Sequence, residues 1–285
     1  MKPAVFAYHR PTEVAEALAI LDAYGGQARV LAGGQSLMPL LNMRLLRPEA
    51  LIDINDIDDL DQVLLEGDRT VLGALVRYTT VERTLAARLP LLAEAITHVG
   101  DRQVRNRGTV GGALAQGDPT GELPLACLVL DAVVVVRGAA GVRRIPVREF
   151  YEGPYATVLG PAEMVVAAEF PRPPAHHAFG EICRRHNDFA VVAVAAAGDR
   201  RPDGTWHDVR LGVGGVADTP LRIPAAERAL EGTRLAEEDL RAAAGEVEGA
   251  IDPPDDVRAS AEYRRHLTGV QVMRVLGRLR AEGEK

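Results

Sequence analysis

The chain has 285 residues, of which 47% are hydrophobic and 26% are charged, and its formal net charge is −7. This composition is typical of a globular protein with a hydrophobic core, and the interspersed charges form no basic patch of the kind that binds nucleic acid. No apolar run of about 18 residues occurs, so the sequence predicts no membrane-spanning segment.

The first part of the chain, residues 1–54, alternates predicted strands and helices. Thr12 is expected to cap a helix whose apolar residues recur at helical spacing as far as Leu21. A short buried strand then ends at a pair of glycines, and Ser36 is expected to cap a second helix with the sequence SLMPLLNMRLL. Another strand follows at 51–54. We therefore expect a compact β-α-β-α-β unit.

The second part, residues 55–174, mixes strands and helices and ends at the proline cluster PRPP. Proline clusters of this kind are typical of boundaries between structural units. The expected elements are strands at 63–65 and 70–75, helices at 81–89 and 91–99, an irregular glycine-rich stretch at 105–117, a helix at 123–130, a hairpin of 132–137 and 142–146, and a strand at 164–170.

The third part, residues 175–285, opens with strands and closes with two helices. The last helix carries an apolar stripe at helical spacing, which predicts packing against a core. The expected elements are strands at 178–184, 191–197 and 206–213, and helices at 237–249 and 261–280.

Two cysteines, Cys127 and Cys183, are the only thiols of the chain. An ordinary iron–sulfur cluster needs four thiolates, so this chain cannot supply one by itself. No histidine pair has the spacing of a known metal motif, and we predict no metal site. The N-terminal segment lacks the apolar centre of a signal peptide, so we expect the protein in the cytoplasm.

The first glycine-rich loop is Ala32-Gly33-Gly34-Gln35-Ser36, between a predicted strand and a predicted helix. Glycines allow the backbone to approach a phosphate closely and to direct N–H groups toward it, and the Ser36 hydroxyl can donate one more hydrogen bond. A paired glycine between strand and helix is equally compatible with a plain turn. The loop matches neither the dinucleotide fingerprint GxGxxG nor the P-loop.

The second glycine-rich loop is Thr109-Val110-Gly111-Gly112-Ala113, which is followed by Asp118. Its backbone and the Thr109 hydroxyl offer donors to a phosphate, and Asp118 can accept from ribose hydroxyl or adenine amino groups. The alternative is a connecting loop in which Asp118 begins a turn before Pro119. Two such loops favour a dinucleotide over a mononucleotide, because a diphosphate with two nucleotide ends can use both.

Five segments together resemble a known family. They are AGGQSLMPLLNMRL, VRNRGTVGGALAQGDPTGELP, RRHNDFAVVAVA, GVGGVADTPLR with AERALEG downstream, and YRRHLTGVQVMRVL. In this order, and over nearly the whole chain, they look like the FAD-binding subunit of the xanthine dehydrogenase family, the medium chain of carbon monoxide dehydrogenase and related bacterial hydroxylases.

The resemblance implies an α+β fold, in which two α/β subdomains of the vanillyl-alcohol-oxidase type clamp FAD and a C-terminal antiparallel sheet with helices follows. The domains are expected at 1–54, 55–174 and 175–285. It also implies that residues 32–36 and 109–113 hold the pyrophosphate and that Asp118 contacts the adenosine half. Asp188 and Phe189 match an aspartate–aromatic pair near the flavin, although ordinary core packing is the alternative for Phe189.

The function implied by the resemblance is electron transfer. FAD would receive electrons from an iron–sulfur small subunit, which in turn takes them from a molybdenum-cofactor large subunit, and would pass them to an external acceptor. A dimer of such heterotrimers is the implied assembly. Two alternatives stay open: a stand-alone flavin oxidase or monooxygenase with Tyr151, Tyr155 and His186 near its substrate, and a non-enzymatic flavin-binding assembly module.

Overall fold

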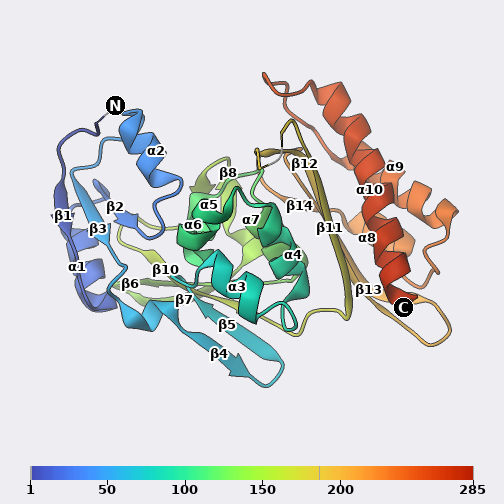
Figure 1. Ribbon diagram of the computed structural model, residues 1–285, viewed down its shortest axis with the longest axis horizontal. Coiled ribbons are helices and arrows are strands. Elements are labelled where there is room, and N and C mark those ends of the chain that lie inside the picture. The colour runs from blue at the N-terminus through green and yellow to red at the C-terminus, as the bar shows by residue number, and fades with distance from the viewer. Residues whose placement is uncertain (1, 186, 285) are drawn as a thin grey trace.

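The computed structural model describes residues 2–185 and 187–284. Figure 1 shows the parts of the chain in sequence order along the long axis, from the N-terminal strands at one end to the C-terminal helices at the other. Three main sheets follow one another in this direction, and helices lie between and beside them. None of the helices in the described residues is long and apolar enough to cross a membrane.

The N-terminal unit has the expected β-α-β-α-β order, with three parallel strands arranged β1-β3-β2. Thr12 is not the helix cap, because α1 begins after Glu13, and the Thr12 N–H donates to the carboxylate of Glu16. The second helix is shorter than expected, and the Ser36 side chain makes no capping bond. The elements are β1 (Ala7–His9), α1 (Val14–Ala23), β2 (Ala28–Leu31), α2 (Leu37–Asn42) and β3 (Ala50–Asp53).

The middle part is an antiparallel five-stranded sheet of order β4-β5-β10-β6-β7 with five helices beside it. Its elements are η1 (Asp58–Asp61), β4 (Val63–Glu66), β5 (Arg69–Gly73), α3 (Tyr78–Thr84), α4 (Pro90–His98), α5 (Arg102–Arg107), α6 (Val110–Gln116), α7 (Glu122–Val129), β6 (Val133–Gly138), β7 (Gly141–Pro146), η2 (Val147–Glu149), β8 (Tyr151–Gly153), β9 (Ala156–Thr157) and β10 (Met164–Phe170).

Most of the glycine-rich stretch 105–117 lies in α5 and α6, which corrects the expectation of an irregular segment. Asp101 caps α5 by accepting from the Val104 N–H at 2.9 Å, and Thr109 caps α6 by accepting from the Gly112 N–H at 3.1 Å. A side chain at Gly111 would lie 2.5 Å from the Cβ of Ala74, so close packing demands glycine there. Capping and packing thus outweigh the low helix propensity of glycine.

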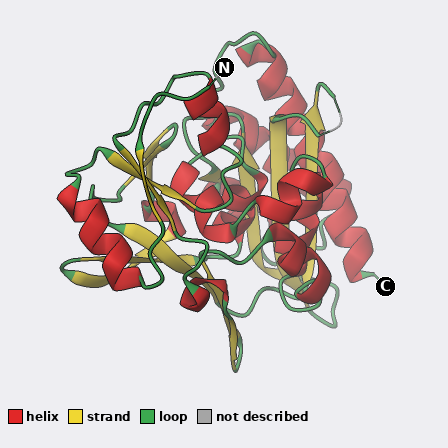
Figure 2. Cartoon of the chain, turned by 60° about the vertical axis from the view of Figure 1, so that its left-hand side comes forward, coloured by secondary structure: helices red, strands yellow, loops and turns green. Residues whose placement is uncertain are grey.

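The C-terminal part is an antiparallel sheet of order β11-β12-β13-β14. Helices cover both of its faces: α8 and α10 contact one side, and α4 and α7 of the middle part contact the other (Figures 1 and 2). The elements are β11 (His176–Cys183), β12 (Ala190–Arg200), β13 (Trp206–Gly214), β14 (Leu221–Arg222), α8 (Pro224–Leu230), α9 (Glu237–Ala250) and α10 (Ala261–Gly283).

Strand β12 is buried on both faces and separates two hydrophobic cores. Ala193 and Ala195 belong to the core shared with the middle part, whereas Val194 and Ala196 belong to the core beneath α10. The observed architecture confirms an α+β fold with a C-terminal antiparallel sheet. The expected boundaries at residues 54 and 174 lie between β3 and β4 and between β10 and β11, and the division into three domains stays a prediction.

Candidate functional site

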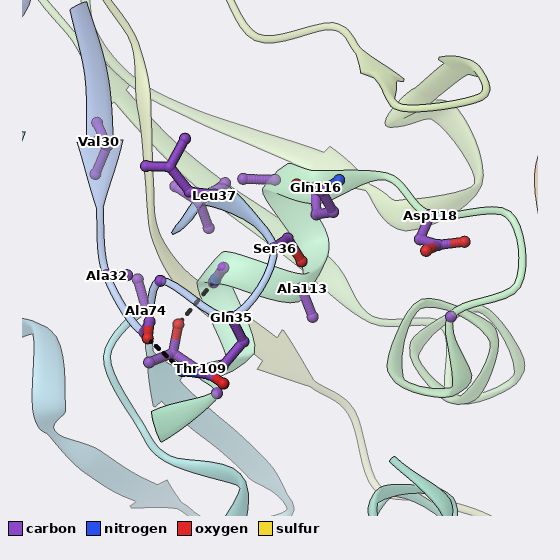
Figure 3. A pocket seen from close by; sticks show the side chains of 18 of the residues that line it. Val30, Ala32, Gln35, Ser36, Leu37, Ala74, Thr109, Ala113, Gln116 and Asp118 are labelled. Carbon is purple, nitrogen blue, oxygen red and sulfur yellow. Dashed lines mark hydrogen bonds between the residues drawn. The ribbon is translucent and has the colours of Figure 1, made fainter. Parts of the chain in front are cut away.

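A cavity of about 930 Å³ lies between the N-terminal sheet, the middle helices and the loop before β12. Two glycine-rich segments meet along it: residues 32–36 follow β2, and residues 108–113 lead into α6. Figure 3 shows Val30 and Asp118 on opposite sides of these segments. The two segments therefore form the middle of the cavity, with one end on either side.

The first segment offers a run of free backbone donors. The N–H groups of residues 33–36 donate to no acceptor in the described ranges 2–185 and 187–284. Gly34 has φ +74°, in the left-handed region that favours glycine, and the Gln35 amide donates to the Gly33 carbonyl at 3.0 Å. Four successive free amides beside a cavity form a cradle for an anion such as a phosphate.

The second segment was expected to offer free backbone N–H donors like those of the first, but it does not. The N–H groups of Val110 and Gly111 donate to the carbonyls of Val76 and Ala74 at 3.0 and 2.9 Å, and the Gly112 N–H donates to the Thr109 hydroxyl. These amides are therefore already bonded within the protein. Val110 is buried and does not line the cavity, whereas the other five residues of 108–113 do. The segment thus contributes close backbone packing more than free donors.

The two segments touch, and polar side chains hold them together. A Cβ at Gly33 would lie 2.1 Å from the carbonyl oxygen of Arg107, so only glycine permits this approach. The Asn55 amide donates to the Ala32 carbonyl at 2.9 Å and accepts from the Arg77 guanidinium at 2.6 Å, and Arg77 also donates to the Arg107 carbonyl at 2.6 Å. We call Asn55 and Arg77 the loop strap. Sequence reasoning missed it, because neither residue belongs to a glycine-rich motif.

One end of the cavity is mainly apolar. It lies between the N-terminal sheet and the segment that precedes and enters β10. Its apolar lining residues are Leu21, Ala28, Val30, Leu159, Pro161 and Met164. Aliphatic walls of this kind suit a flat aromatic ring system such as adenine.

The other end mixes aromatic and acidic side chains and reaches the surface. Phe189 is 55% exposed, and the guanidinium of Arg258 lies 4.9 Å from its ring centre. Ordinary core packing is therefore not the role of Phe189. Asp188 lines the cavity and accepts from the Phe189 N–H at 2.9 Å.

Asp118 lies at the end of the cavity that Phe189 occupies. Burial, and then the nearby Asp118 carboxylate, raise the pKa of Tyr155, while the charge of Arg258, the residue above Phe189, lowers it. One carboxylate oxygen of Asp118 accepts from the N–H and hydroxyl of Thr120 at 2.8 and 2.7 Å, so Asp118 also forms the turn considered as its alternative role.

Glu122 is a cavity residue that sequence reasoning did not identify. It stands in the first turn of α7, and its carboxyl group lines the same end as Asp118. Burial above all, with the charges of Glu181 and Asp118 in addition, raises the pKa of Glu122 to about 8. The available signal was an acidic residue directly after the glycine-rich segment, within GDPTGE.

Of the residues considered for a stand-alone oxidase, the two that the structure describes, Tyr151 and Tyr155, do not both line the cavity. Tyr155 lines the cavity, but the hydroxyl of Tyr151 is buried without a hydrogen-bond partner in the described part of the chain. His186 lies outside the described residues. Within residues 2–185 and 187–284, no group of three His, Cys, Asp or Glu side chains has the arrangement of a metal site.

Comparison with known proteins gives matches over almost the whole chain. A family model described as the FAD binding domain in molybdopterin dehydrogenase matches residues 4–173. A second, described as the CO dehydrogenase flavoprotein C-terminal domain, matches residues 177–279.

Individual relatives agree with these matches. The carbon monoxide dehydrogenase medium chain of Afipia carboxidovorans is 36% identical and covers 100% of both chains. Subunit alpha of the 6-hydroxypseudooxynicotine dehydrogenase complex of Paenarthrobacter nicotinovorans is 36% identical over 98% of this chain and 95% of its own length. A structure of carbon monoxide dehydrogenase from Hydrogenophaga pseudoflava superimposes with a TM-score of 0.96, at 38% identity and 99% coverage of each chain.

Proposed function

This chain belongs to the family of FAD-binding medium subunits of molybdenum hydroxylases, and from that premise we propose that it carries electrons between a partner subunit and an external acceptor. FAD, when bound, accepts electrons singly and releases them as a pair. The protein supplies binding, orientation and the electrostatic surroundings. The observation that carries the proposal is the cavity, which places four free backbone amides between an apolar end and an acidic, surface-reaching end.

The residues present fit FAD. In our proposal the amides of 33–36 and the Ser36 hydroxyl hold the pyrophosphate, and Thr109, Gly111, Gly112 and Ala113 form the opposite wall. The adenine occupies the apolar end beside Val30, and the flavin ring occupies the end with Glu122, Asp188 and Phe189.

This orientation is supported by polarity and exposure. The pyrimidine part of a flavin ring needs hydrogen-bond partners, which the carboxyl groups of Glu122 and Asp188 provide, and the exposure of Phe189 gives a partner subunit access to this end. Asp118 lies at the same end. We therefore propose that Asp118 contacts the sugar chain that leads to the flavin ring, in place of the adenosine contact that the sequence suggested.

The chain is one subunit of a multi-subunit dehydrogenase, as its relatives' names describe medium chains and complex subunits. We propose an iron–sulfur small subunit and a molybdenum-cofactor large subunit as partners, in a dimer of heterotrimers. The two cysteines of this chain are fewer than the four thiolates of an ordinary cluster, so iron–sulfur centres must belong to another chain. Neither thiol forms a disulfide, which is compatible with the reducing cytoplasm as its compartment.

The test is recovery of the tagged chain from its native host, followed by metal and flavin analysis. We expect FAD, iron and molybdenum in a fixed ratio, with substrate-driven flavin reduction in the complex. The isolated FAD-loaded chain should not oxidise a hydroxylase substrate. Normal turnover of an organic substrate by the isolated chain would instead support a stand-alone oxidase, an alternative that the complex-forming relatives do not favour.

A further inference from the structure

A second cavity, of about 480 Å³, adjoins the first. It is lined by Thr97 and His98 at the end of α4, by Glu181 and Cys183 on β11, and by the nearby Arg185 and Asn187. Asn187 also lines the large cavity, so the two meet at this residue. None of the other five residues lines the large cavity.

Glu181 is a buried carboxyl group at the centre of this second cavity. Its side chain is only 7% exposed. One oxygen, Oε1, lies 3.4 Å from Nδ1 of His98 and accepts from the thiol of Cys183 at 3.1 Å. The other, Oε2, is buried and has no hydrogen-bond partner among the described residues. A buried polar atom without a partner is costly to keep, which suggests that this oxygen has a functional partner that exchanges.

The charged and titratable groups around Glu181 form a series between the surface and the flavin end. His98 is about one-third exposed and faces Glu181 from α4, and Glu122 lies close enough on α7 for the Glu181 charge to raise its pKa. Burial and the Glu181 carboxylate raise the pKa of the Cys183 thiol, so Cys183 stays protonated and holds Glu181 in place. Arg185 completes the lining.

Electron transfer through FAD creates a need for such a series. Reduction of FAD to FADH₂ takes up two electrons and two protons. Under the proposed function, on which this inference rests, electrons arrive singly from the partner's iron–sulfur clusters, and these clusters bring no protons. The protons must therefore come from solvent through this chain or along its surface.

We propose that His98, Glu181 and Glu122 form a proton route from the surface to the flavin end of the large cavity. With FAD bound, Glu122 would supply its carboxyl proton to the reduced ring and become a carboxylate. His98 passes a proton to the Glu181 carboxylate, Glu181 passes that proton to Glu122 across the junction at Asn187, and His98 regains a proton from water. Each proton that enters the flavin is thus matched by one taken from solvent. When the acceptor removes the electrons, a proton that does not leave with them returns by the same groups.

The chemistry of each group suits its place. The two ring nitrogens of an imidazole allow it to accept a proton at one and donate from the other, which fits a residue at the entrance. A carboxyl group whose pKa is raised to about 8 can both hold and release a proton near neutral pH, which fits Glu122 beside the flavin. The unpartnered oxygen of Glu181 is free to form the hydrogen bond through which the proton passes onward.

The experiment uses the full FAD-loaded chain without partners. A photochemical one-electron donor reduces the flavin rapidly in weakly buffered solution, while a pH-indicator dye reports proton uptake and flavin absorbance reports reduction. Glu181→Gln and His98→Gln are the test variants, because neither residue lines the large cavity. Glu94→Gln is the matched control: Glu94 is a partly buried carboxylate on the same helix as His98, and it lines neither cavity.

We expect both test variants to bind FAD as the parent does, and to take up protons at least about tenfold more slowly. Glu94→Gln should match the parent in its rate of proton uptake. Normal FAD content with parental uptake rates in both test variants would overturn the route and leave the proposed function intact. Failure of the parent chain to bind FAD would contradict the proposed function itself. If Glu181→Gln does not fold, His98→Gln decides the outcome, because its side chain lies at the edge of the cavity.

Discussion

Gly33→Ala should separate the two cavity segments and weaken FAD binding. The new Cβ would lie 2.1 Å from the Arg107 carbonyl oxygen. Since carbon and oxygen atoms normally stay at least about 3.3 Å apart, the segments must move apart by about 1 Å. A hydrogen bond to a charged group contributes about 1.5–3 kcal/mol, so each amide that loses its phosphate contact weakens binding roughly tenfold to a hundredfold. We expect the Kd for FAD to rise by at least about tenfold.

The assay is titration of the apoprotein with FAD, followed by flavin fluorescence or calorimetry. Gly67→Ala is the matched control: Gly67 lies in the β4–β5 turn with φ +59°, and no atom lies within 4 Å of an added Cβ. It should lower stability by about 1–2 kcal/mol, because alanine is strained in the left-handed region, and it should leave the Kd unchanged. If folded Gly33→Ala bound FAD with the parental Kd, the close contact between the segments would not be part of the cofactor site.

Three further changes test other parts of the structure. Because the pKa of Glu122 is raised from 4.5 to about 8, its contribution to stability is fully present below pH 4.5 and is lost as the pH rises through about 8. Glu122→Gln should therefore raise the Tm of the apoprotein at pH 9 and leave it unchanged at pH 4. If calorimetry gave the parent and this variant the same dependence of Tm on pH, the prediction would be contradicted. Asn55→Ala removes the hydrogen bond from the loop strap to the first segment, so the Kd for FAD should rise roughly tenfold in the same titration while the Tm falls little. A large fall in Tm with an unchanged Kd would indicate a purely structural role. Arg264 is 2% exposed and donates to the carbonyls of Val191 and Gly215. Arg264→Met should therefore lower the free energy of unfolding in urea by roughly 3 kcal/mol. An unchanged midpoint of urea unfolding would refute a stabilising role for this guanidinium.

The regular elements could be predicted because their local signals agree with their final surroundings. The apolar residues of α1, which begins at Val14, recur at helical spacing, and the structure buries them. Strand β3 is a short apolar run, and the structure buries all four of its residues. The helix α6 could not be predicted from propensity, because its Gly111 and Gly112 are poor helix formers in isolation. The place of Gly111 in this helix depends on close contact with Ala74, which is distant in sequence.

Some residues of the candidate site also have a local sequence signal, and others have none. Residues 32–36 and 109–113 attract attention in the sequence because glycine pairs have a direct physical meaning. Glu122 and Asn55 carry no such local signal, since their importance comes from a cavity and from carbonyl groups that only the folded chain brings near. Phe189 was recognised only through the family resemblance, and its exposure became visible in the structure. Burial and long-range contact were therefore the missing information.

The double burial of β12 bears on how this polypeptide can be divided. The two family models meet between residues 173 and 177, which would invite expression of each half as a separate fragment. However, Ala193 and Ala195 complete the core of the N-terminal half, so a fragment ending near residue 173 would leave an apolar wall open to solvent. Such a fragment should aggregate, whereas both halves produced together should associate. If the gene were split at this point, its two products would therefore have to be co-expressed.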